Sequence, residues 1–147
     1  MTDRTGQCLC GAVKFKANDM ADTFSSCYCD SCQRWAGGPY NGVSVATENL
    51  EFEGHEHIGI IKTTSFAERA FCKKCGSGIW WKLTFGQYVG NTSIPVGLLD
   101  DRSGLVLSDE MYSDFKDHTN ERPENVAQMT SAEADAVVAT FSEGERK

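Results

Sequence analysis

The sequence predicts a mainly β protein of short strands, followed by one C-terminal helix. Short apolar and β-branched runs are separated by glycine, asparagine, glutamate, threonine and serine, which is the strand spacing of an all-β domain. These runs lie at 40–46, 50–52, 57–62 and 66–71. A different pattern follows Thr130, where Ala134, Val137, Val138 and Phe141 recur at the spacing of one helix face. With 147 residues, the chain has the length of a single domain over 1–147.

The first expected strand lies at 10–17, where apolar residues alternate with Lys14 and Lys16. We expect both lysines on a solvated strand face, because lysine is seldom buried. Gly11 directly follows a cysteine and can take the positive φ that a metal-binding turn often needs. A later aromatic strand at 79–83 contains Trp80 and Trp81, whose side chains should point to opposite faces. We expect one of these rings in the core and the other at the wall of a cleft.

The last third of the chain changes character. Glycines and a proline at 88–99 predict bent strands, and 105–115 has the composition of two further short strands. The polar stretch 117–128 predicts a loop. Thr130 and Glu133 have the spacing of a capping box, so we expect a helix at about 131–142 that ends near Gly144. Because so short a helix is marginal alone, its apolar face should pack against the sheet or a partner subunit.

The distributions of charged and of apolar residues argue against several classes of function. The net charge is −7, of which residues 1–100 carry −1 and residues 101–147 carry −6. An acidic chain without a basic stripe is a poor ligand for nucleic acid, whose phosphates need neutralising. No apolar run reaches membrane-spanning length, and residues 1–7 lack the apolar segment of an export signal. We therefore expect a cytoplasmic protein that binds neither nucleic acid nor membrane.

All seven cysteines fall into three groups at metal-ligand spacing. The groups are Cys8 with Cys10, then Cys27 with Cys29 and Cys32, and then Cys72 with Cys75. Seven thiols divide naturally into four for a closed structural zinc site and three for a catalytic site with an open position. Disulfides would leave one cysteine over, and clustered cysteines in a reducing compartment usually bind metal. A remaining alternative is that a histidine (His55, His57 or His118) completes the triplet, which would make that site structural too.

Motifs in a fixed order give the chain a resemblance to a known family. They are G-x-C-x-C-G-x-V-x-F at 6–15, C-x-C-x-x-C-x-R at 27–34 and F-C-x-x-C-G-S at 71–77, with V-G-L-L-D-D at 96–101. Over about 6–101 the chain resembles the glutathione-dependent formaldehyde-activating enzyme family, also known through centromere protein V. The resemblance implies a zinc-bound "β-tent" fold of short, coiled antiparallel sheets with two Zn²⁺ per chain. It implies that the structural zinc is bound by Cys8, Cys10, Cys72 and Cys75, and the catalytic zinc by Cys27, Cys29 and Cys32.

Two positions depart from the family pattern. Tyr28 stands where the family usually has histidine, and Gln33 stands where it commonly has arginine, with Arg34 next. A phenol is a poor group for moving protons near neutral pH. The identity of the substrate therefore follows less directly from the resemblance than metal binding does. Arg34 could pair with a substrate carboxylate or merely offset the anionic zinc cluster. Gly37 and Gly38 could present backbone amides to an anion, or form an ordinary Gly-Gly-Pro turn. These three residues are the candidate substrate-binding residues.

The chemistry of the triplet indicates a thiol ligand. A zinc ion held by three thiolates is a soft centre that favours a further thiolate. The resemblance implies that this ligand is glutathione, and that the activity is a carbon–sulfur lyase interconverting glutathione plus formaldehyde and S-hydroxymethylglutathione. Two other classes of function stay open: a carrier that binds thiol adducts without catalysis, and a structural zinc module that serves a protein partner.

Overall fold

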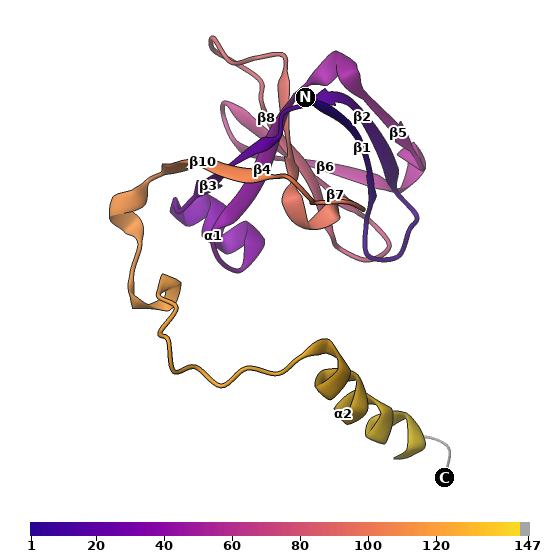
Figure 1. The fold of residues 1–147 in the computed structure, drawn as a ribbon. Helices are drawn as coiled ribbons and strands as arrows, with labels where there is room; N and C mark the ends of the chain where they lie inside the picture. Colours follow the sequence, from indigo (N-terminus) through magenta and orange to yellow (C-terminus); the bar gives the residue numbers. More distant parts are fainter. Residues whose placement is uncertain (145–147) are drawn as a thin grey trace. The chain divides into compact units, whose positions relative to one another are not determined.

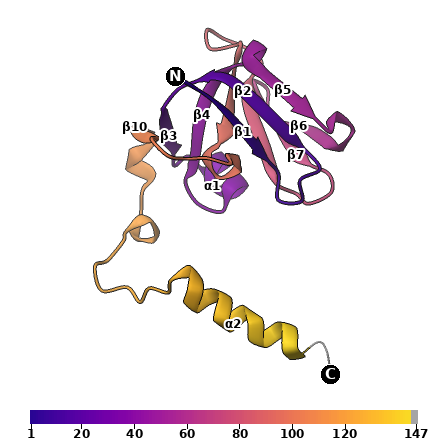
Figure 2. The same cartoon turned by 45° about the vertical axis from the view of Figure 1, so that its right-hand side comes forward.

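The computed structural model describes residues 1–144 (Figures 1 and 2). The chain divides into two units, Met1–Lys116 and Asp117–Lys147. The first unit contains the strands and the short helix α1 (Asp30–Ala36), and the second contains α2 (Ser131–Gly144). A single domain over 1–147 stays a prediction.

The strands of the first unit form two sheets. One sheet has the order β1-β2-β5, and the larger has the order β10-β3-β4-β9-β8-β7-β6. Their bounds are β1 (Thr2–Gln7), β2 (Lys14–Met20), β3 (Thr23–Cys27), β4 (Tyr40–Ala46), β5 (Leu50–Glu53), β6 (Ile58–Thr64), β7 (Ala67–Cys72), β8 (Gly78–Leu83), β9 (Asn91–Pro95) and β10 (Val106–Met111). The prediction of a mainly β fold with antiparallel sheets and a C-terminal helix is confirmed. One pair differs, because β10 runs parallel to β3 (Figure 1).

The main hydrophobic core combines residues from both sheets. Val13, Met20, Val43, Ile79 and Ile94 have no exposed surface, and they come from the segment before β2 and from β2, β4, β8 and β9. Along a strand, alternate side chains point to opposite faces. Side chains that do not enter this core lie on the other face of the large sheet, where the candidate site forms.

Most expected strands are found within one or two residues of their predicted ends, and 40–46 is matched in full by β4. Among the described strands and α-helices, β1, β3 and α1 were not predicted. Helix α1 includes Gln33–Ala36, which directly follow the cysteine triplet. The second strand expected within 105–115 is a 3₁₀ turn, Ser113–Phe115.

The two neighbouring tryptophans point to opposite faces, as predicted. Trp80 is 7% exposed and belongs to the main core. Trp81 packs with a second cluster formed by Cys27, Cys32 and Tyr40, and its ring lines a pocket. Lys14 and Lys16 are exposed on β2, as expected for a solvated strand face.

Strand β1 is fixed to the segment after β9 by a buried arginine. Arg4 is 7% exposed, and its guanidinium donates to the carbonyl oxygens of Asp101 (2.8 Å) and Ser103 (3.1 Å). Thr5 adds a hydrogen bond from its hydroxyl to the Asp100 carboxylate at 2.7 Å. The acidic end of the 96–101 motif thus holds the N-terminal strand in place.

In the second unit, the predicted capping box of α2 is present. Glu133 accepts a hydrogen bond from the Thr130 backbone N–H at 2.7 Å, and its own N–H donates to the Thr130 hydroxyl at 3.3 Å. Within this unit Val137, Val138 and Phe141 are 46%, 57% and 68% exposed, and packing of this apolar face against the sheet or a partner subunit stays a prediction. Of the described helices, none combines the length and the apolar character needed to cross a bilayer.

Candidate metal centres

The first cysteine cluster joins two tight turns that lie far apart in the sequence. Cys8 and Cys10 lie between β1 and β2, and Cys72 and Cys75 lie at the turn between β7 and β8. In each turn the glycine after the second cysteine is left-handed, with φ of 73° at Gly11 and 76° at Gly76. The glycine N–H donates back to the first cysteine's carbonyl, at 3.0 Å to Cys8 and 2.8 Å to Cys72. This geometry turns both thiols of a pair to the same side, and glycine adopts it without strain.

The spacing of the four sulfurs suits a tetrahedral zinc site. All four Sγ atoms lie within 4.8 Å of one another. The Cys8–Cys10 and Cys10–Cys72 sulfur distances are 3.7 and 3.9 Å. Zinc–thiolate bonds of about 2.3 Å in a tetrahedron place the sulfurs about 3.8 Å apart. The four thiols and these two distances therefore fit the ligand set of a zinc ion.

Ser77 connects the two turns of this cluster. Its hydroxyl accepts a hydrogen bond from the Leu9 N–H at 3.0 Å and lies 3.2 Å from the Cys75 sulfur. Hydrogen bonds from Ser77 lower the pKa of the Cys75 thiol to about 5. A thiol that ionises readily is prepared to bind a metal, because the thiolate is the ligand.

The second cluster is built where β3 runs into α1. Cys27 ends β3, Cys29 is the N-cap residue of α1, and Cys32 lies within the helix on its buried side. Their sulfurs lie within 4.8 Å of one another. No described carboxylate joins this triplet, and neither does His55 or His57. His118 belongs to the second unit.

Unlike the first cluster, in which Cys10 is exposed, the triplet has no exposed cysteine. Cys27 and Cys32 are each 4% exposed, whereas Cys29 is half-buried. Burial raises the pKa of the Cys27 thiol. Burial also raises the pKa of the Cys32 thiol, to about 12, against the opposite effect of a hydrogen bond from Arg69. A cation that neutralises the thiolates would reverse this preference for the protonated form.

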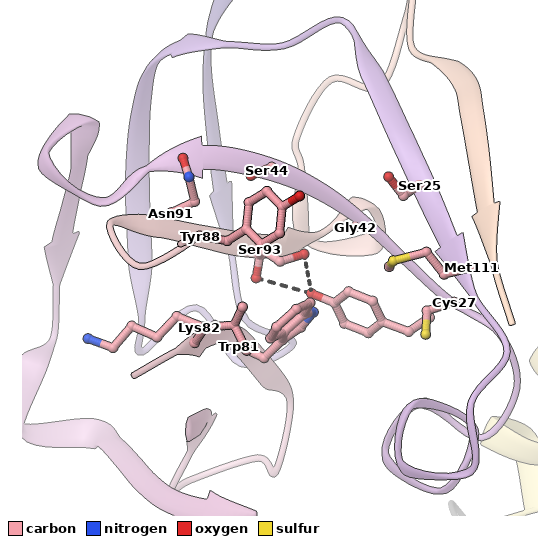
Figure 3. Close-up of a pocket in the computed structure, with 12 residues that line it drawn as sticks. Ser25, Cys27, Gly42, Ser44, Trp81, Lys82, Tyr88, Asn91, Ser93 and Met111 are labelled. Atoms are coloured by element: carbon pink, nitrogen blue, oxygen red, sulfur yellow. Dashed lines mark hydrogen bonds between the residues drawn. The ribbon is translucent and has the colours of Figure 1, made fainter. Parts of the chain in front are cut away.

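A pocket of about 440 Å³ opens beside Cys27 on the face of the large sheet away from the core (Figure 3). The lining residues from β3, β4 and β9 alternate along their strands, which places them on one face of the sheet. The lining residues are Ser25, Cys27, Tyr40, Gly42, Ser44, Trp81, Lys82, Leu83, Tyr88, Asn91, Ser93 and Met111. Figure 3 shows Lys82 extending to the side of the pocket away from Cys27.

Comparison with known proteins shows which family the chain resembles. The profile of the glutathione-dependent formaldehyde-activating enzyme family matches residues 3–114. The chain belongs to this family. An uncharacterized lyase of Schizosaccharomyces pombe is 34% identical over 87 residues, which cover 59% of this chain and 63% of that protein. A Halomonas elongata protein named for the same glutathione-dependent activity is 35% identical over 83 residues, covering 51% and 53%.

The chain thus matches little more than half of the length of these two relatives. A crystal structure of a Rhodobacter sphaeroides protein has a TM-score of 0.54 and 23% sequence identity, covering 65% of this chain and 87% of that one. This likeness supports the fold alone. The family resemblance identified from the cysteine motifs is confirmed.

The three candidate substrate-binding residues lie on or just after α1. Arg34 is exposed in the last turn of the helix. Gly37 is the left-handed C-cap, and its N–H already donates to the Gln33 carbonyl at 2.8 Å. Neither glycine lines the pocket beside Cys27. A role for Arg34, Gly37 and Gly38 in binding substrate stays a prediction.

Tyr28, at the position where the family usually has histidine, faces β10. Its side chain is buried, and its hydroxyl donates to the Glu110 carboxylate at 2.8 Å. The Lys116 ammonium lies 4.8 Å from the centroid of the phenol ring and also bonds Glu110. Hydrogen bonds from Lys116, then from Tyr28, lower the pKa of Glu110. Tyr28 thereby anchors β10 beside the triplet, a structural role that its position in the motif did not indicate.

Tyr28→Phe is expected to lower the free energy of unfolding by about 1–2 kcal/mol, because it removes one hydrogen bond to a charged acceptor. Zinc content and any catalytic rate should be unchanged. Chemical denaturation and metal analysis measure both, with Tyr112→Phe as the exposed control. A loss of zinc or of activity at unchanged stability would instead assign the phenol a chemical role.

The sequence did not single out Arg69. This arginine is 6% exposed on β7, and its Nη2 lies 3.7 Å from the Cys32 sulfur. The strand alternation that groups Ala67 with Arg69 was the available signal for an inward-facing side chain. Arginine at such a position is usually interpreted as solvated, because charged residues are rarely buried.

Proposed function

We propose that the protein is a zinc-dependent carbon–sulfur lyase acting on a thiol–aldehyde adduct, such as S-hydroxymethylglutathione formed from glutathione and formaldehyde. The observation that carries this proposal is the open triplet. Three thiols converge without a fourth ligand from the described part of the first unit, and Cys27 borders a substrate-sized pocket. Membership of the family and the names of the two relatives support the same class of reaction.

Two zinc ions per chain would have different roles. The closed set of four thiols, Cys8, Cys10, Cys72 and Cys75, would hold a structural ion between two turns. Cys27, Cys29 and Cys32 would hold the catalytic ion and leave one position for the substrate sulfur. When bound there, zinc would keep that sulfur ionised at a pH where a free thiol is mostly protonated.

The reaction needs no oxidant or reductant. In the synthetic direction the thiolate sulfur attacks the aldehyde carbon, the S–C bond forms, and the carbonyl π pair moves to oxygen. The proton that the thiol lost is returned to that oxygen, and cleavage is the reverse. The protein's own contribution is to orient the two reactants in a site of limited water access, which supplies much of the rate gain in such additions.

The pocket next to Cys27 is the proposed site for the rest of the substrate. Trp81 and Tyr88 offer apolar surface, and Ser44, Asn91 and Ser93 offer hydrogen-bonding groups (Figure 3). Arg34, exposed on the helix that carries Cys32, would meet a carboxylate of an anionic thiol such as glutathione at the rim. We keep Gly37 and Gly38 as candidate backbone contacts to the same ligand.

The test is a rate measurement with the spontaneous reaction subtracted. Glutathione and formaldehyde are mixed with and without the zinc-loaded protein, and S-hydroxymethylglutathione is followed by NMR exchange. We expect acceleration in proportion to protein concentration. Binding of glutathione without acceleration would indicate a carrier, and isolation with a constant stoichiometric partner in place of thiol binding would indicate a structural module. Either result refutes the lyase.

A further inference from the structure

Arg69 occupies an unusual position for a charged side chain. It lies in β7 directly opposite Trp81 of β8, with 6% of its surface exposed. Its guanidinium carbon is 5.6 Å from the ring centroid of Trp35 and 6.0 Å from that of Trp81. The guanidinium is therefore enclosed by the helix α1 on one side and by the large sheet on the other.

The guanidinium has no carboxylate partner. None of the ion pairs among the described residues includes Arg69. Its polar contact is the bond from Nη2 to the Cys32 sulfur at 3.7 Å, while Nη1 is buried without a partner. Aromatic rings stabilise a cation only in part, and arginine stays protonated in proteins. A buried charge of this kind needs a nearby anion.

The cysteine triplet, in its thiolate form, is the anion next to this guanidinium. Three thiolates carry one negative charge more than a divalent ion neutralises, and a fourth thiolate from a substrate would add another. We infer that Arg69 is the fixed countercharge of the triplet: it positions Cys32 and balances the metal-bound thiolates, so that an anionic sulfur ligand is accepted. This inference rests on the metal site proposed above.

Arg69 is a positioning residue in this scheme, because it acts through Cys32 and not on the substrate. Residues that hydrogen-bond metal ligands commonly contribute about 10- to 100-fold to metal affinity. Arginine suits the place better than lysine, since its flat, weakly hydrated guanidinium fits between two indole rings. The same enclosure fixes the direction from which the N–H group reaches Cys32.

The test compares Arg69→Met, which removes the charge at similar length, with Arg69→Lys, which retains it. Chelator competition measures the affinity of the second, weaker metal equivalent, and the absorption of cobalt-substituted protein is recorded with and without glutathione. For Arg69→Met we expect about 10- to 100-fold weaker binding of that equivalent and a smaller response to glutathione. Arg69→Lys should recover part of both effects. Arg102→Met, the same change at an exposed arginine, should match the wild type.

A stability comparison keeps the inference open to refutation should Arg69→Met fold poorly. Cys32→Ala leaves the guanidinium without its anion. The double variant Cys32→Ala with Arg69→Met should therefore have a higher melting temperature than Cys32→Ala alone. A further decrease in the double variant would overturn the inference, as would unchanged metal affinity and cobalt spectra in Arg69→Met. None of these measurements uses turnover. An inactive wild type with the expected metal results would refute the lyase and leave the role of Arg69 intact.

Discussion

Cys72→Ser is expected to remove one zinc equivalent and to leave the first unit largely unfolded. Cys72 has no exposed surface, and its sulfur lies 3.9 Å from that of Cys10, which is 62 positions away in the sequence. The proposed ion therefore joins the β1–β2 turn to the β7–β8 turn. Structural zinc binds with about 10–16 kcal/mol in small zinc-dependent folds, which is comparable with the whole stability of a domain.

Zinc analysis, far-UV circular dichroism and thermal unfolding measure this effect. Cys29→Ser is the matched control, because it makes the same chemical change in the other cluster. Reversible loss of structure when the wild type is treated with a strong chelator, and recovery on adding zinc, would support the same conclusion without a mutation. A Cys72→Ser protein with unchanged zinc content and melting temperature would rule out the structural assignment of this cluster.

Cys29→Ser should reduce the rate of thiol–aldehyde chemistry to that of the spontaneous reaction while the protein stays folded. Cys29 is the most exposed member of the triplet and lies at the N-cap of α1. Its loss leaves two thiols, which are too few to hold an ion firmly at an open site. The four-cysteine cluster and the main core contain none of the triplet residues, so they should be unaffected.

The expected measurements are one zinc equivalent per chain, an unchanged melting temperature within a few degrees, and no rate above the background. Mild chelation of the wild type should also give a folded, inactive protein with one zinc equivalent, because the triplet should release its metal before the closed site does. Cobalt at the triplet should change its spectrum when glutathione is added to the wild type and should be absent from Cys29→Ser. Full activity of this variant would disprove the assignment of the catalytic site.

The sequence was sufficient where local pattern determines structure. Strand β4 and the aromatic strand β8 follow from alternation and composition, and the capping box of α2 follows from two residues three positions apart. Strand β1 was not predictable in this way because it is polar. It contains the buried Arg4, whose guanidinium donates to carbonyl groups almost a hundred positions away and to the Asp22 carboxylate. Helix α1 has seven residues, too few to show a helical period.

The same distinction applies to the site. Spacing gave three local groups of cysteines, since ligands one or two residues apart can reach a common ion. The family resemblance predicted that the first and last groups join, and the structure brings those four sulfurs within 4.8 Å of one another. The partners around them come from distant segments, as with Arg69 near Cys32, 37 positions away, and Glu110 near Tyr28, 82 positions away. No local pattern encodes such contacts, so the buried cation and the anchoring of Tyr28 required the structure.

The two clusters also differ in when they can be completed as the chain is made. The triplet lies within six consecutive residues, 27–32, and is complete as soon as that segment leaves the ribosome. The other cluster is complete only when Cys75 has been added, 65 positions after Cys10, which takes about 3–13 s at ordinary rates of synthesis. During that interval Cys8 and Cys10 are an unfinished pair of thiols, while the triplet already offers three. We therefore expect a nascent chain stalled before Cys72 to carry its metal at the catalytic cluster, so that the first ion acquired is the one the finished protein holds less tightly.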